Sequence, residues 1–128
     1  MSLHARDLML VAVGGAIGSV ARYFVGQLMG PRADNTIPWH TFVVNATGAF
    51  AIGLVLVLAA RHGWPGWWRP LIAVGILGGY TTFSTFSLEI VALALHGSQA
   101  YTLAYGLGSL AAGVLGAYAG IITGRTVA

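Results

Sequence analysis

The sequence predicts an all-α membrane protein with four transmembrane helices. The chain of 128 residues has 6 Lys+Arg and 3 Asp+Glu, so 7% of it is charged, against about 25% in an ordinary soluble domain. Its mean hydropathy is +0.81. A water-soluble chain this short exposes too much surface to carry so few charges. The composition therefore excludes a soluble globular enzyme, and it also excludes disorder, which requires the opposite composition.

Four apolar segments of membrane-spanning length follow one another. Because a span needs roughly 20 mostly apolar residues, the chain holds four spans in one domain, 1–128, with short connections. The spans run over about 8–29, 39–60, 70–95 and 100–123. The first ends before a turn-rich stretch that starts at Gly30 and Pro31. The third begins at Pro70, a residue suited to a first helical turn.

The charged residues and tryptophans agree with these boundaries. Four tryptophans lie at span ends, where amphipathic rings prefer the membrane interface; they are Trp39, Trp64, Trp67 and Trp68. Of the charged side chains, Arg22 and Glu89 alone fall inside a span. Intramembrane charges are functional candidates. We expect Arg22 to snorkel to the interface or to lie at a pore mouth, and Glu89 to line a vestibule, carry protons or pair with Arg22.

The third span has an unusual sequence. Residues 75–87 read GILGGYTTFSTFS, in which a glycine pair precedes five hydroxyl side chains. Each glycine costs about 1 kcal/mol relative to alanine in a helix, and irregular backbone at membrane depth survives only where protein buries it or it lines a wet cavity. Broken membrane helices also expose carbonyl groups that can hold ions. We therefore expect this helix to be broken near its middle.

Several neutral groups in the spans are candidates for a polar path. Asn45, in the second span, can donate two hydrogen bonds, and Tyr105 and Ser109 lie one turn apart in the fourth. Phe83 and Phe86 share a face of the third span if it is helical. A phenyl edge carries partial positive charge, so it can face an anion. Packing is the alternative role for each of these groups.

Glycines recur at one-face helical spacing, which lets helix backbones approach closely. This spacing fits packing within one bundle or contact between subunits. Because four short helices hardly enclose a polar path, we expect an oligomer. The motifs are Gly14–Gly18, Gly26–Gly30, Gly75–Gly79 and Gly116–Gly120–Gly124.

The motif GGYTTFSTFS at 78–87 closely resembles the Fluc (CrcB) family of bacterial fluoride channels. The resemblance covers essentially the whole chain, including GGAIGSVARY at 14–23 and WHTFVVNATGAF at 39–50. It implies an antiparallel dual-topology homodimer in the bacterial plasma (inner) membrane. Two pores, each lined by both subunits, would export fluoride passively and lower its cytoplasmic level. Where family members often have a further serine one turn beyond Ser109, this chain has Gly113.

The resemblance also implies roles for individual residues. A structural sodium ion at the dimer centre would be held by the backbone carbonyls of Gly78 and Thr81. The fluoride pore would be lined by Phe83, Phe86, Asn45, Ser84, Thr85, Tyr105 and Ser109. Such a pore suits fluoride, because neutral donors replace its water in steps and conduction needs several weak sites.

Two other functions remain to be weighed. A proton-coupled small multidrug transporter has a similar size and needs a membrane-embedded carboxylate, for which Glu89 is the candidate. A structural subunit of a larger complex is compatible with the glycine faces. Enzymatic chemistry is not expected, since there is no carboxylate pair, plausible triad or cysteine. The pI near 9.8 rests on scattered arginines, so we expect no nucleic-acid partner.

Overall fold

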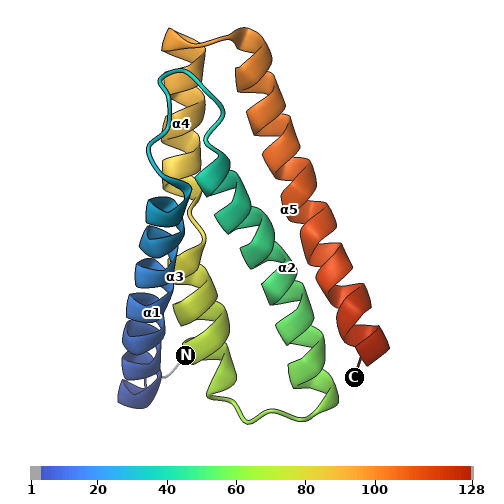
Figure 1. Cartoon of the computed structure of the whole chain (residues 1–128). Coiled ribbons are helices and arrows are strands. Elements are labelled where there is room, and N and C mark those ends of the chain that lie inside the picture. Colours follow the sequence, from blue (N-terminus) through green and yellow to red (C-terminus); the bar gives the residue numbers. More distant parts are fainter. Residues whose placement is uncertain (1–3, 128) are drawn as a thin grey trace.

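The computed structural model describes residues 4–127, which form four long apolar helical segments (Figure 1). They are α1 (Ala5–Met29), α2 (Trp39–Arg61), a third segment over Arg69–His96, and α5 (Gln99–Val127). Each is long and apolar enough to cross a membrane. The sequence-predicted spans agree with these helices to within a few residues at each end.

The third segment consists of three pieces. A π-helical stretch, η1 (Arg69–Leu77), continues into α3 (Gly78–Tyr80), and α4 (Phe83–His96) follows. Between α3 and α4 the backbone is extended, with φ −79° and ψ 156° at Thr81 and φ −148° and ψ 114° at Thr82. The glycine pair is itself helical, so the extended residues lie just after it.

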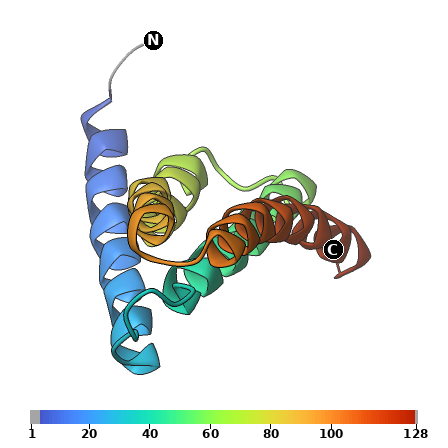
Figure 2. The ribbon, with the colours of Figure 1, turned by 90° about the horizontal axis from the view of Figure 1, so that it is seen from above.

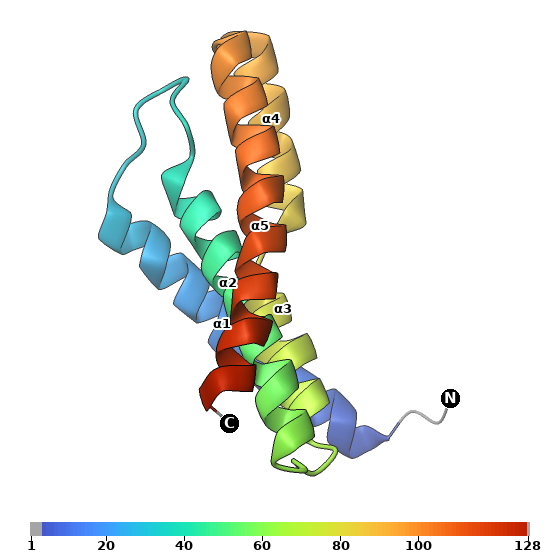
Figure 3. The ribbon, with the colours of Figure 1, turned by 90° about the vertical axis from the view of Figure 1, so that its right-hand side faces the viewer.

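The helices pack as two pairs. Seen from above (Figure 2), α1 lies on one side and α2 with α5 on the other, with the third segment between them. The main contacts join α2 to α5 and α1 to η1 and α3. In Figure 3, α1 crosses the other helices obliquely. The α1–α2 connection and the α4–α5 turn lie at one end of the molecule, and the α2–η1 connection lies at the other (Figure 1).

Glycines make both pairings possible. A side chain at Gly14 or Gly18 would collide with the backbone of η1, and one at Gly79 would meet the Gly15 carbonyl. On the other pair, a side chain at Gly120 would collide with the Phe50 carbonyl of α2. These glycines therefore serve packing within the chain. Gly26 and Gly30 differ, because a Cβ there would come within 4 Å of no other part of the described chain.

The side chains are distributed as in a membrane protein. Large apolar residues on every long helix are exposed, among them Val20, Leu56, Leu88 and Leu115. The most buried residues, in contrast, include the polar Thr41, Thr82 and Glu89 together with Tyr105. Polar groups in a membrane protein turn inward because hydrocarbon offers them no partner. The buried polar groups consequently indicate where a functional site lies.

Candidate functional site

The extended residues of the third segment are held by one side chain of α2. Asn45 accepts a hydrogen bond from the Thr82 N–H at 2.8 Å, and its amide donates to the Thr82 carbonyl at 3.1 Å. Asn45 therefore gives the Thr82 N–H the partner that a continuous helix would supply, and it also contacts the Thr82 carbonyl, which as the N-cap carbonyl accepts the first bond of α4. Unsatisfied backbone groups are costly within a membrane, so this pairing stabilises the interruption.

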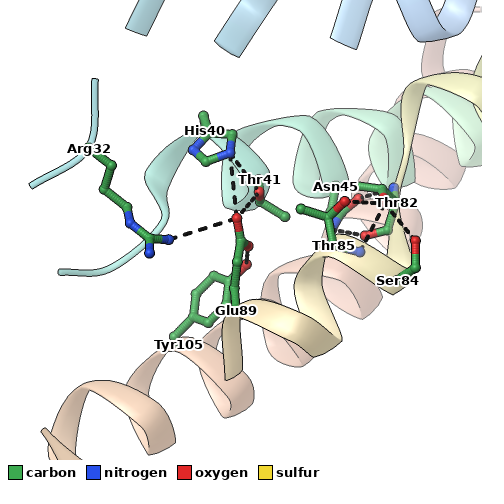
Figure 4. A network of polar contacts seen from close by, with 9 residues as sticks. All are labelled: Arg32, His40, Thr41, Asn45, Thr82, Ser84, Thr85, Glu89 and Tyr105. Atoms are coloured by element: carbon green, nitrogen blue, oxygen red, sulfur yellow. Dashed lines mark hydrogen bonds and ion pairs between the residues drawn. The ribbon is translucent and has the colours of Figure 1, made fainter. Parts of the chain in front are cut away.

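The first turn of α4 is capped by the same threonine. The Thr82 hydroxyl oxygen accepts a hydrogen bond from the Thr85 N–H at 3.3 Å and donates to the Thr85 hydroxyl at 3.0 Å. Threonine is a favoured N-cap because its oxygen satisfies one of the free N–H groups of a helix start. Ser84 Oγ lies 3.5 Å from Thr82 Oγ1. The hydroxyls of Thr82, Ser84 and Thr85 thus form one connected cluster (Figure 4).

Two backbone carbonyls beside this cluster lose their usual partners. In a continuous helix the Gly78 carbonyl would accept from the Thr82 N–H, four residues on, but that N–H donates to Asn45. The Thr81 carbonyl would likewise accept from the Thr85 N–H, which donates to the Thr82 hydroxyl. These are the two carbonyls that the family resemblance implies as ligands of a sodium ion.

A cavity of about 510 Å³ adjoins the interruption. It is mostly apolar, and the predicted site residues among its lining are Asn45, Gly78, Thr81, Phe83, Phe86 and Ser109, with Gly113 beside them. The rings of Phe83 and Phe86 have their centroids 5.9 Å apart. Phe83 is 78% exposed, so its ring is available to a neighbouring molecule.

Ser109 brings a free hydroxyl to this cavity. Its oxygen is buried and has no hydrogen-bond partner within the described part of the chain. An unpartnered buried hydroxyl is unusual, and it calls for a ligand, a water or a contact outside the chain. Gly113, one turn further along α5, adds no side chain to this track.

Glu89 is the centre of a second polar group, at the end of the molecule that carries the α1–α2 connection. The Tyr105 hydroxyl donates to Oε2 at 2.6 Å, and the Thr41 hydroxyl donates to Oε1 at 2.9 Å. Arg32 Nη1 lies 3.8 Å and His40 Nε2 3.5 Å from the same Oε1 (Figure 4). Among the described residues, the arginine that pairs with Glu89 is Arg32. Pairing with Arg22, one of the three roles suggested for Glu89, is therefore not observed.

A second cavity, of about 530 Å³, joins the two polar groups. Its lining includes Arg22, Arg32, His40 and Thr41, together with Thr82 and Thr85. Thr82 lines both cavities, so it lies where they approach one another. Arg22 thus borders this cavity.

Tyr105 and Ser109, one turn apart on α5, have different surroundings. Tyr105 is 2% exposed and bonded to Glu89, and its ring packs against Phe86 with centroids 5.2 Å apart. Ser109 lines the first cavity instead.

Thr41, Arg32, His40 and Thr82 were not among the sequence-predicted site residues. A signal existed for Thr41, because Thr41 and Asn45 are four residues apart in α2 and share a helix face. None existed for Arg32, which comes from an irregular connection.

Comparisons with known proteins agree with one another. Residues 9–121 match the family described as CrcB-like protein, Camphor Resistance (CrcB). A curated relative from Rhizobium meliloti (strain 1021), named fluoride-specific ion channel FluC, is 43% identical over 121 residues, 94% of this chain and 97% of the relative. A relative of the same name from Thermus thermophilus is 45% identical over 112 residues, 88% and 90% of the two chains. One from Acidobacterium capsulatum is 42% identical over 118 residues, 91% and 94%.

Proposed function

We infer that this chain, which belongs to the CrcB family of proteins, is a multi-pass bacterial membrane protein that conducts fluoride. It is an ion channel and not an enzyme. In the structure, the first cavity is the main support for this function. There, neutral donors and phenyl rings, including the unpartnered Ser109 hydroxyl, stand in place of a full positive charge. Such a lining suits an anion that must lose its water in steps and still be released.

The pore in this proposal begins at the second cavity, beside Arg22, and continues past Thr85 and Ser84. It ends along Asn45, Phe83 and Phe86 in the first cavity. Arg22 raises the local concentration of anions at the entrance, since a cationic group in a cleft attracts them. Ring edges and hydroxyls then replace water around the ion. Tyr105 acts by packing against Phe86 and holding it in place.

The working unit in this proposal is an antiparallel homodimer with two pores. Three features support a second copy of the chain. The Phe83 ring, which lines the first cavity, is exposed, the Ser109 hydroxyl lacks a partner among the described residues, and Gly26 and Gly30 present an unfilled small-residue face. A partner subunit would close the cavity and supply the remaining lining.

A sodium ion at the centre of this dimer fits the donors present. The Gly78 and Thr81 carbonyls are released from the helix ladder, and carbonyl oxygens suit a hard cation. When bound, sodium would cross-link the two interruptions and lend positive potential to the nearby anion path. Asn45 and Thr82 keep the carbonyls free by taking the N–H groups that would otherwise cover them.

The multidrug-transporter alternative is not favoured. It needs a carboxylate that exchanges protons with a drug in an open chamber, whereas Glu89 is 9% exposed and bonded to Thr41 and Tyr105.

Fluoride conduction is tested with the purified protein in liposomes. We expect rapid efflux of fluoride, measured with an ion-selective electrode, and no comparable efflux of chloride. Neutral donors at close spacing favour the small anion, so selectivity is part of the expectation. Absent fluoride efflux, or equal rates for both anions, would contradict the channel function.

Sodium binding is tested apart from transport. We expect the detergent-solubilised dimer to withstand a higher temperature in Na⁺ than in N-methyl-D-glucamine at equal ionic strength, followed by size exclusion after heating. An ion that binds only the folded state at 100 times its Kd stabilises it by about 2.7 kcal/mol. Equal melting in both salts would argue against the ion.

The antiparallel arrangement further requires a cysteine placed at Ser98 to be labelled from both sides of the membrane.

A further inference from the structure

A fluoride path that borders Glu89 meets an electrostatic difficulty. Glu89 lies one turn along α4 from Thr85, which lines the second cavity. The Glu89 side chain is 11% exposed, so water screens its carboxylate poorly. A negative charge in such a place repels an anion strongly, because Coulomb energy grows as the local dielectric constant falls. The channel therefore needs a way to cancel this charge.

The groups around Glu89 differ in how far they neutralise its negative charge. Tyr105 and Thr41 donate hydrogen bonds, which spread the charge but leave the net charge unchanged. His40 is cationic only when protonated. Arg32 is the partner that carries a full positive charge at any pH of interest, and its Nη1 is 3.8 Å from Oε1.

Arg32 also has a structural position that suits this task. It belongs to the α1–α2 connection, which precedes α2, whereas Glu89 lies on α4, so their contact joins two parts of the chain far apart in sequence (Figure 4). Its side chain is 31% exposed and lines the second cavity together with Arg22, Tyr23 and His40. Arg22 lines the same cavity without being the ion-pair partner of Glu89.

We propose that Arg32 is a positioning residue for conduction, which neutralises the Glu89 carboxylate beside the entrance of the fluoride path. The proposal rests on the fluoride channel function above. It assigns the α1–α2 connection a part in the pore entrance. Breaking a buried ion pair by removing one partner leaves an uncompensated charge, so the harm done by losing Arg32 depends on Glu89 being present.

The test compares fluoride efflux from liposomes for four variants. We expect Arg32→Gln to lower the rate by about tenfold, the effect of about 1.4 kcal/mol on a barrier. Arg32→Lys keeps the charge and is expected to retain most of the rate. Adding Glu89→Gln to Arg32→Gln removes the uncompensated carboxylate and is expected to restore efflux above that of Arg32→Gln alone. Arg125→Gln, which removes an equal charge at the end of α5, is the matched control and should behave as wild type.

The outcomes separate this proposal from the function on which it rests. A wild-type protein without fluoride efflux would overturn both. Efflux in wild type with an unaffected Arg32→Gln variant, or a double variant no faster than Arg32→Gln, would overturn the proposal alone. Size exclusion shows whether each variant assembles. If Arg32→Gln fails to assemble, recovery of assembly in the double variant supports charge cancellation, and continued failure contradicts it.

Discussion

Replacing Phe86 by isoleucine is expected to reduce fluoride efflux by about tenfold or more, a cost of at least about 1.4 kcal/mol at the barrier. Isoleucine keeps an apolar side chain at the cavity but has no ring edge with partial positive charge. The Phe86 ring lines the first cavity and packs against Tyr105 at 5.2 Å between centroids. Phe83→Ile should have a similar effect, since its exposed ring lines the same cavity.

The measurement is the initial rate of fluoride efflux from liposomes at equal protein content. Phe24→Ile is the matched control, because Phe24 lies on α1, is 60% exposed and lines neither cavity. All three variants should elute as wild type on size exclusion. Wild-type efflux in both Phe83→Ile and Phe86→Ile would show that the rings only pack and would remove them from the pore.

Substitution of Gly18 by alanine is expected to destabilise the protein by about 1–3 kcal/mol, the usual cost of overpacking. A Cβ at Gly18 would collide with the Ile76 carbonyl and lie 2.8 Å from the Tyr80 N. Both are backbone atoms of the third segment, so no side chain can rotate away. Since α1 packs mainly on η1 and α3, the substitution separates α1 from the segment that carries the interruption.

Gly15→Ala is the control for this effect, because it lies on the same helix and its added Cβ meets nothing within 4 Å. Alanine is better than glycine in a helix by about 1 kcal/mol, so this variant should be as stable as wild type or more so. Heating in detergent followed by size exclusion ranks the two variants. Equal melting of Gly15→Ala and Gly18→Ala would rule out the close α1–η1 contact.

The third segment has an irregular stretch whose exact position the sequence does not predict. Its glycine pair and hydroxyls pointed to irregular backbone, but not to the residues concerned. Gly78 and Gly79 are helical, and Gly79 serves the close approach of α1 at Gly15. Thr81 and Thr82 are extended instead, and the Asn45 side chain stabilises this conformation by bonding to both the N–H and the carbonyl of Thr82. That partner lies 37 residues away, and no local pattern identifies it.

Glu89 illustrates the same limit for a charge. Its place inside a span makes it a functional candidate, and the sequence offers Arg22 as the intramembrane arginine that could pair with it. The structure pairs it with Arg32, which the sequence placed in a polar connection. The pairing depends on how the α1–α2 connection lies against α4, and such a connection has no periodicity from which its course can be predicted.

The four helices, their approximate ends and the family to which the chain belongs could all be inferred from the amino-acid sequence. The length of the apolar segments, the placement of charges and a rare motif are all local properties of the sequence. In the hydrocarbon of a membrane, a spanning segment can form only a helix or part of a closed barrel. The packed helices were needed to show that Asn45 holds Thr82, that Arg32 meets Glu89 and that Ser109 brings an unpartnered hydroxyl to the first cavity. These pairings depend on how each helix is rotated and shifted relative to its neighbour. Steric contact between backbones that are distant in sequence sets that rotation and shift.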